Sequence, residues 1–372
     1  MSIDLSKMPK LGFGCMRLPV IDDEIDLEQM KQMVDLYMEA GLNYIDTAYV
    51  YHHGKSEVAI REAIVKRYPR DSFILADKLP AWEIHGKEDR DRVFNEQLER
   101  TGAGYFNMYL LHSVEDGNIS VYRDNDCFNW AMEKKEQGLI RHFGFSFHGS
   151  PDLLRELLDQ HPEVEFVQIQ LNYLDWENPF VRSGELYNIL REHNIPMVIM
   201  EPIKGGTLAK LKPELEELYK EVDPERSIAS WALRFVGSLP GVMTILSGMS
   251  ALEQMQDNVQ TFTDFKPLNE TEQETIQKVV KIMLDTPQIG CTACRYCTDG
   301  CPMSIAIPDI FKAVNTMNMY GDTFRPKAFY RSLLKDHGKA SDCLQCGQCE
   351  SVCPQHLPII ELLQKASGML DE

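Results

Sequence analysis

The chain has 372 residues, of which 44% are hydrophobic and 26% charged, values typical of globular proteins. Its net charge of −19 and pI near 5.0 argue against nucleic acid or an anionic membrane as a partner. No apolar run approaches the length of a membrane span, and the opening stretch MSIDLSKMPKLGFG lacks the layout of a secretory signal.

From residue 11 to about 250, short β-rich segments alternate with amphipathic stretches. Eight strands are expected, at Leu11–Met16, Asn43–Ala48, Phe73–Leu79, Met108–Ser113, His142–Phe147, Phe166–Asn172, Pro196–Pro202 and Val242–Gly248. Apolar residues recurring at three- and four-residue steps predict helices between them, at Leu27–Ala40, Ser56–Tyr68, Asp89–Thr101, Pro151–Gln160 and Ser183–His193. Gly41 is expected to end the first helix, and Pro151 to begin the fourth.

Eight strands alternating with helices predict an α/β fold, a (β/α)8 TIM barrel. The alternative, a doubly wound sheet, would usually carry a GxGxxG turn after its first strand, and none is present. We therefore expect a barrel over residues 1–265. From 266 to 372 we expect a linker helix, Leu268–Leu284, and a small, mainly α-helical domain.

Eight of the ten cysteines form two copies of the pattern C-x2-C-x2-C-x3-C-P, 52 residues apart. This run is typical of two [4Fe-4S] clusters, in which the cysteine beside proline ligates the other cluster. The sequence predicts one cluster on Cys291, Cys294, Cys297 and Cys353, and one on Cys343, Cys346, Cys349 and Cys301. Disulfides and structural zinc are the alternatives, although zinc sites use CxxC pairs rather than this run of four.

The region around these cysteines suggests a duplicated helix–cluster unit. Helices are expected at Ile307–Tyr320 and Ile359–Ala366, each soon after a Cys-Pro pair. The spacing resembles the α-helical ferredoxin domain of multi-subunit dehydrogenases. Cluster ligation needs reduced thiols, so we expect a cytoplasmic protein. The remaining Cys15 and Cys127 are expected to be buried and inert.

Reactive side chains are expected at the carboxyl ends of three successive strands, where TIM barrels place their active sites. They are Asp46, followed by Tyr51, then Lys78, then His112. A nearby ammonium stabilises a phenolate, so Lys78 is expected to lower the pKa of Tyr51 and make it a proton donor. Asp46 would hold Lys78 charged, and His112 would hydrogen-bond a carbonyl oxygen.

The stretches that carry these residues resemble the aldo/keto reductase family, over roughly residues 8 to 262. DTAYVYHHGKSE begins at Asp46, DKLP contains Lys78, and YLLHS contains His112. The resemblance implies catalysis by Tyr51, Lys78, Asp46 and His112, with hydride transferred from NADPH, or less often NADH, to an aldehyde or ketone.

The resemblance also implies contacts with the nicotinamide cofactor. GLIRHFGFS supplies Ser146, QLNY supplies the carboxamide-contacting Gln170, and EPIKGG resembles the loop over the pyrophosphate. SGMSALEQMQDN resembles the segment that binds the adenosine phosphate. The cofactor-binding residues implied are Ser146, Gln170, Met200, Pro202, Lys204, Gly205, Ser250, Gln254, Asp257 and Asn258.

Several positions depart from the family pattern. Phe147 replaces an asparagine, Met200 a tyrosine that stacks on nicotinamide, and Glu201 a serine. No Arg or Lys occurs in Ser247–Asn258, where members that prefer NADP place cations, which leaves Lys204 as the nearby candidate. The choice between NADPH and NADH stays open.

Hydride transfer moves two electrons, whereas cubane clusters pass one at a time, so three functions are considered. In the first, the barrel reduces a small carbonyl compound with NAD(P)H, and the clusters exchange electrons with a redox partner protein or support the fold. In the second, the barrel binds a ligand on which the clusters perform one-electron chemistry. The third is an electron-transfer subunit with a degenerate barrel, which the intact tetrad argues against.

Overall fold

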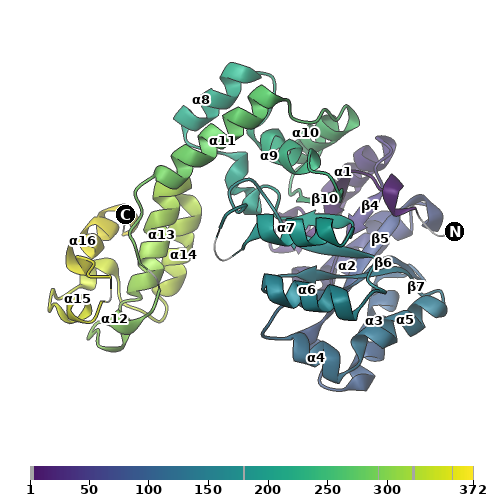
Figure 1. The fold of residues 1–372 in the computed structure, drawn as a ribbon, viewed down its shortest axis with the longest axis horizontal. Coiled ribbons are helices and arrows are strands. Elements are labelled where there is room, and N and C mark those ends of the chain that lie inside the picture. Colours follow the sequence, from purple (N-terminus) through teal and green to yellow (C-terminus); the bar gives the residue numbers. More distant parts are fainter. Residues whose placement is uncertain (1–3, 179–180, 292, 321–322, 354, 372) are drawn as a thin grey trace. The chain divides into compact units, whose positions relative to one another are not determined.

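The computed structural model describes residues 4–178, 181–291, 293–320, 323–353 and 355–371. Eight parallel strands close into a barrel in the order β1-β10-β9-β8-β7-β6-β5-β4, which confirms the predicted fold class (Figure 1). The strands are β1 Leu11–Gly14, β4 Tyr44–Asp46, β5 Ile74–Pro80, β6 Phe106–Val114, β7 Ile140–Phe147, β8 Phe166–Gln170, β9 Met197–Met200 and β10 Val242–Gly248.

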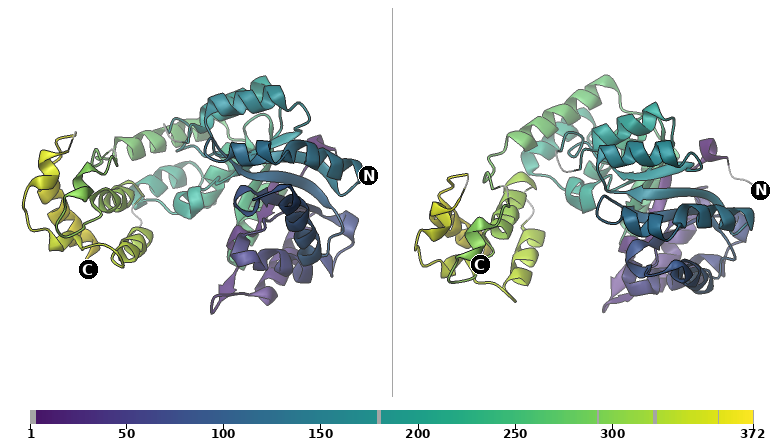
Figure 2. Two further views of the ribbon diagram at one scale, coloured as in Figure 1. Left: turned by 90° about the horizontal axis from the view of Figure 1, so that it is seen from below. Right: turned by 60° about the horizontal axis from the view of Figure 1, so that its bottom comes forward.

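Helices surround the barrel strands, as the two further views also show (Figure 2). They are α1 Leu27–Glu39, α2 Lys55–Ile60, α3 Lys87–Thr101, α4 Ile119–Asp124, α5 Cys127–Glu136, α6 Pro151–Gln160, α7 Ser183–Glu192, α9 Ile228–Gly237 and α10 Leu252–Thr263. A short hairpin of β2 Val20–Ile21 and β3 Glu24–Ile25, which the sequence analysis missed, lies between β1 and α1.

The first helix shows why the helical predictions were successful. Asp26 caps α1 by accepting a hydrogen bond from the backbone N–H of Gln29, and Gly41 follows its end with a φ of 77°. Met30, Met33, Val34 and Tyr37 form the buried face at helical spacing.

The predicted helix Ser56–Tyr68 is different in the structure. It consists of α2 followed by a π-helical turn over Arg61–Val65. Apolar spacing alone could not separate these forms, because both keep Ala63 and Ile64 buried.

The chain forms two compact units. The first comprises Met1–Ala209 with Arg226–Gln273, and the second Lys210–Glu225 with Glu274–Glu372. The remaining helices are α8 Pro213–Val222, α11 Glu270–Asp285, α12 Tyr296–Asp299, α13 Ile307–Tyr320, α14 Phe324–Leu333, α15 Gln348–Ser351 and α16 Ile359–Leu370. The domain boundary at 265/266 stays a prediction. Within the described ranges, no helix is long and apolar enough to cross a membrane.

The second unit repeats its local structure at the offset of its cysteine motifs. Helix α15 begins 52 positions after α12, and α16 begins 52 positions after α13. Ile307 and Phe311 of α13 pack in one apolar core with Leu363 and Ala366 of α16. The structure thus shows the helices repeating at the offset of the cysteine motifs, although Pro354 of the second motif lies outside the described residues.

Barrel closure leaves no room for a side chain at Gly144 of β7. A Cβ there would collide with the carbonyl oxygen of Phe166 in β8 and lie 3.0 Å from its ring. We expect Gly144→Ala to lower the free energy of unfolding by about 1–3 kcal/mol, the usual cost of overpacking. Denaturant unfolding under anaerobic conditions measures it.

Gly117→Ala is the matched control, because the nearest atom to its Cβ would be 3.9 Å away. Equal stabilities of the two variants would contradict the packing argument.

Candidate functional site

Three neighbouring strands of the barrel bring the predicted tetrad together. Asp46 is the last residue of β4, and Tyr51 opens the 3-10 turn that follows the strand. Lys78 and His112 lie two residues before the ends of β5 and β6. Each of these strands ends one residue later than the sequence predicted. Because β4 pairs with β5 and β5 with β6 in parallel, all four side chains lie at one end of the barrel.

The ammonium of Lys78 is the centre of this site. Its Nζ lies 2.7 Å from Oδ1 of Asp46, 2.6 Å from the carbonyl oxygen of Thr47 and 3.4 Å from the hydroxyl of Tyr51. The Lys78 side chain is fully buried, and that of Asp46 nearly so. Burial disfavours the ammonium, but Asp46 and Tyr51 outweigh this effect, and the pKa of Lys78 is raised.

The expected lowering of the Tyr51 pKa is wrong in this structure. Burial of the phenol raises its pKa, and this outweighs the opposing effect of the Lys78 ammonium. Tyr51 therefore keeps its proton at neutral pH. Lys78 still acts in the expected direction, since its charge favours the phenolate that forms when the proton leaves.

His112 lies near two aromatic rings and near the charge of Lys78. Its ring centroid lies 6.0 Å from that of Tyr51 and 5.2 Å from that of Trp82. Burial, the charge of Lys78 and the neighbouring His148 hold the pKa of His112 well below its usual value. The imidazole is thus neutral at pH 7. Its Nδ1 has no hydrogen-bond partner among the described residues.

Gln170, one of the predicted nicotinamide contacts, is positioned by a buried acid that the sequence analysis missed. Its Nε2 donates to Oδ2 of Asp175 at 3.0 Å, and Asn172 donates to the same oxygen at 2.8 Å. Elsewhere on the rim, Ser146 accepts a 2.7 Å hydrogen bond from the N–H of Ser113. The sulfur of Met200 lies 3.5 Å from Nε2 of Gln168.

Lys204 is not the available cation that the sequence suggested. Its Nζ lies 2.5 Å from Oδ1 of the fully buried Asp175, so its charge is already paired. The loop nevertheless has unusual backbone geometry, because Glu201, Lys204 and Gly205 all have positive φ.

A different cation, Arg17, lies beside the segment predicted to bind the adenosine phosphate. Its carbonyl oxygen accepts a 2.8 Å hydrogen bond from the hydroxyl of Ser250, and its side chain runs along Gly248. The guanidinium lies 3.6 Å from the carboxylate of Glu201 and beside Gly205. About half of the Arg17 side chain is exposed.

The rest of the predicted adenosine segment is internally bonded. Gln254 accepts from the N–H of Ser250 at 2.7 Å, and Asn258 donates to Ser247 at 2.9 Å. Asp257 accepts from Ser227, also at 2.7 Å. The bond of Asn258 joins α10 to β10, and that of Asp257 joins α10 to the residue that caps α9.

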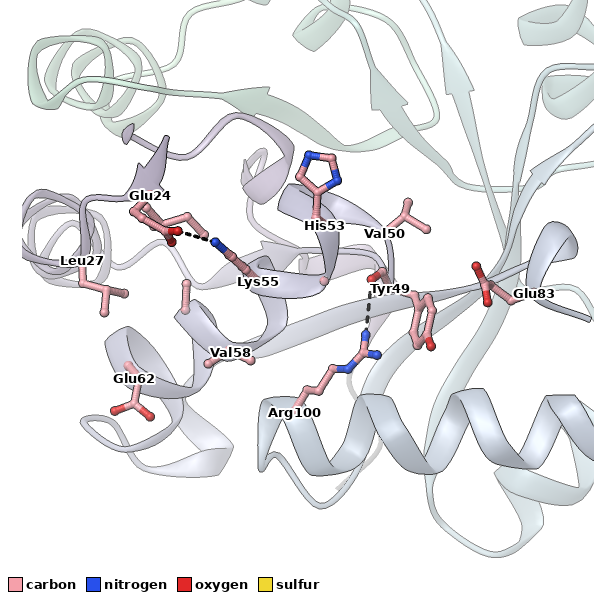
Figure 3. Close-up of a pocket in the computed structure, with 13 residues that line it drawn as sticks. Glu24, Leu27, Tyr49, Val50, His53, Lys55, Val58, Glu62, Glu83 and Arg100 are labelled. Atoms are coloured by element: carbon pink, nitrogen blue, oxygen red, sulfur yellow. Dashed lines mark hydrogen bonds and ion pairs between the residues drawn. The ribbon is translucent and has the colours of Figure 1, made fainter. Parts of the chain in front are cut away.

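An open pocket of about 630 Å³ is lined in part by Tyr49, Val50 and His53, close in sequence to Tyr51 (Figure 3). Its lining includes Tyr49, His53 and Arg100, together with the ion pair between Lys55 and Glu24 (Figure 3). None of the tetrad residues lines this pocket.

The second unit contains two small cavities lined by cysteines. The first is lined by Cys291, Cys294, Cys297 and Cys353, and the second by Cys301, Cys343, Cys346 and Cys349. Each cavity therefore combines three cysteines of one motif with the last cysteine of the other, as the predicted ligand sets require.

The donor set fits clusters better than the alternatives. All ten cysteines are free thiols, and both Cys15 and Cys127 are buried as expected. Among the described residues, no group of three His, Cys, Asp or Glu side chains could hold a single metal ion. The thiols surround cavities instead, which favours iron–sulfur clusters over zinc or disulfides.

Comparison with known proteins decides the family. The aldo/keto reductase family profile matches residues 10–281. The chain belongs to the aldo/keto reductase family. A second profile, that of a 4Fe-4S dicluster domain, matches residues 290–357 and implies two [4Fe-4S] clusters. This aldo/keto reductase is thus an oxidoreductase with a C-terminal iron–sulfur domain.

Individual relatives are similar over most of their length. The uncharacterized oxidoreductase YqkF of Bacillus subtilis (strain 168) is 27% identical over 311 residues, or 75% of this chain and 94% of the relative. The NADH-specific methylglyoxal reductase of Escherichia coli (strain K12) is 26% identical over 274 residues, which cover 61% of this chain and 81% of the relative. The solved structure of the aldo-keto reductase AKR11C1 from Bacillus halodurans (holo form) has 26% identity and a TM-score of 0.60. The match covers 73% of this chain and 91% of that chain.

Three residues of this aldo/keto reductase site escaped the sequence analysis: Arg17, Trp82 and Asp175. Arg17 and Trp82 each lie just beyond the predicted end of a strand, so extending the search by a few residues would have included them. Asp175 follows the QLNY stretch, but nothing in the sequence shows that Gln170 and Lys204 share it.

The cluster assignment makes a prediction about metal content. Anaerobically prepared protein should contain about eight iron and about eight sulfide ions per chain, from two cubanes. Cys353→Ser should lower both, because it removes a thiol from the first cavity. Cys127→Ser should leave both unchanged, since that cysteine lies in the barrel core. A wild-type content near four would mean that one cavity holds no cluster.

Proposed function

We propose that this aldo/keto reductase reduces the carbonyl group of a small aldehyde or ketone with NADPH or NADH. The observation that carries the proposal is the buried contact of Lys78 with both Asp46 and Tyr51. The methylglyoxal reductase relative supports a nicotinamide cofactor and a carbonyl substrate.

The proposed catalytic residues are Tyr51, Lys78, Asp46 and His112. The bound nicotinamide would supply the hydride to the carbonyl carbon. Tyr51 donates its hydroxyl proton to the carbonyl oxygen, and Lys78 stabilises the phenolate that remains. Asp46 keeps Lys78 charged and oriented. Neutral His112 donates a hydrogen bond to the same carbonyl oxygen and orients it.

The electrostatics of the site identify the group that carries the proton. The raised pKa of Tyr51 keeps the phenol protonated, so the proton is in place before hydride transfer. The lowered pKa of His112 keeps the imidazole from competing as an acid. Tyr51 is then the group that delivers the proton.

The cofactor is proposed to lie along the rim from β7 to β10. Ser146, Gln170 and Met200 would face the nicotinamide, and Pro202, Lys204 and Gly205 would cover the pyrophosphate. Ser250, Gln254, Asp257 and Asn258 are proposed for the adenosine end. To these we add Arg17, whose guanidinium lies near the carboxylate of Glu201 and beside Gly205.

The two predicted domains would divide the chemistry. Residues 1–265 would carry out the two-electron hydride transfer, and residues 266–372 would exchange single electrons with a redox partner protein. The ligand sets proposed for the clusters are those that line the two cavities. Such clusters need the reduced thiols of the cytoplasm, where we place the protein.

Replacing Tyr51 tests the proposal. We expect Tyr51→Phe to reduce NAD(P)H-dependent carbonyl reduction by about 10²- to 10⁴-fold, the usual loss with a general acid. Cluster absorbance should persist. Tyr49→Phe is the matched control, because that hydroxyl bonds Glu96 outside the tetrad.

Full turnover by Tyr51→Phe would rule out its role as proton donor. Turnover with a chemical one-electron reductant but none with NAD(P)H would instead favour the alternative, in which the barrel binds a ligand and the clusters perform the chemistry.

Replacing Arg17 tests the placement of the cofactor. A charge-assisted hydrogen bond contributes about 1.5–3 kcal/mol, so Arg17→Ala should raise the Kd for NAD(P)H by about 10- to 100-fold in a fluorescence titration. Arg155→Ala, on the outer helix α6, should leave the Kd unchanged. An unchanged Kd in both variants would remove Arg17 from the cofactor site.

A further inference from the structure

The turn that carries Tyr51 has an unusual backbone. His52 and His53 have φ values of 50° and 55°, and Gly54 follows with 82°. The left-handed region is unfavourable for residues with a Cβ, so two histidines in a row there require support from their surroundings.

The imidazole of His52 provides a contact that favours this conformation. Its Nε2 lies 3.1 Å from the backbone N–H of Leu18, on a segment 34 residues away. Only a neutral imidazole accepts such a bond. Burial, with a smaller effect of His53, lowers the pKa of His52, so the accepting form is present at neutral pH.

Leu18 directly follows Arg17, and this segment is fastened at two further points. Ser250 donates to the carbonyl oxygen of Arg17 at 2.8 Å, and Ser56 to that of Cys15 at 3.1 Å. His52 therefore joins two parts of the proposed site directly, the turn of Tyr51 and the segment of Arg17.

We propose that His52 is a positioning residue, which ties the turn carrying Tyr51 to the segment carrying Arg17. Without its imidazole the turn is free to relax from the left-handed conformation, and the Tyr51 hydroxyl loses its defined distance of 3.4 Å from Lys78. Loss of the imidazole also removes one of the three hydrogen bonds that hold the Arg17 segment. This inference rests on the proposed function, because it assigns His52 a role in that site.

The chain offers a matched pair of variants. His52→Gly removes both the strain and the hydrogen bond. His53→Gly relieves the same strain but leaves the hydrogen bond between His52 and Leu18 in place. Both glycines tolerate positive φ, so neither variant should fail to fold. His52→Gln keeps an acceptor for the Leu18 N–H.

The first measurement is hydrogen exchange of the Leu18 amide in the full chain with its clusters, prepared anaerobically. His52→Gly should reduce protection by about tenfold, the equivalent of one ordinary hydrogen bond. His53→Gly and His52→Gln should keep it. Unchanged protection in His52→Gly would overturn the proposed tie.

The second measurement is the kinetics of carbonyl reduction and the Kd for NAD(P)H. In His52→Gly we expect kcat to fall and the Kd to rise, each by about tenfold or more, because both loops are affected. His53→Gly should stay within about twofold of wild type. Equal kinetics of the two glycine variants would show that His52 does not position the site.

The experiments distinguish failure of the proposed carbonyl reduction from failure of the positioning role of His52. If wild-type protein shows no NAD(P)H-dependent reduction, the proposed function is wrong, while the exchange of Leu18 still decides the tie. If wild type turns over and His52→Gly matches it, only the role of His52 is wrong.

Discussion

The buried charge of Lys78 is the constraint on which the barrel's proposed site depends. Removing an ammonium from water costs several kcal/mol, and the structure offsets this with three oxygens within 3.4 Å. Asp46 and Thr47 come from the end of β4, whereas Lys78 comes from β5. The charge is therefore satisfied only when the two strands pair in their observed register, so the pairing of β4 with β5 is what places the site's central charge.

The second unit is stabilised by other means. Its apolar core is small, with Ile307, Phe311 and Leu363 among its buried members, and much of its chain is loop around the cysteines. Small domains of this kind usually need a disulfide or a metal. The dicluster match explains why this unit manages without disulfides, since bound clusters contribute folding free energy.

Much of this architecture was accessible from the sequence, for identifiable physical reasons. Alternation of strands and helices revealed the barrel, and the cysteine spacing revealed the clusters, because both are local and periodic signals. The contacts of Lys204 and Arg17 were not accessible even where the residues themselves lay close to predicted strands, since they join distant segments. Lys204 is paired by Asp175, and Arg17 reaches Ser250 across 233 residues. The pKa of Tyr51 was misjudged because burial cannot be read from the neighbouring residue types.

The interleaved cysteines have a consequence for biosynthesis. Each cavity draws one thiol from the other half of the repeat, and the first is completed only by Cys353, 62 positions after Cys291. A nascent chain that has emerged through the first motif can therefore offer three thiols to the first cavity and one to the second, but not four to either. The second ligand set is complete only once Cys349 has been synthesised and the first only with Cys353, so a product terminated before Cys349 would carry neither centre in finished form.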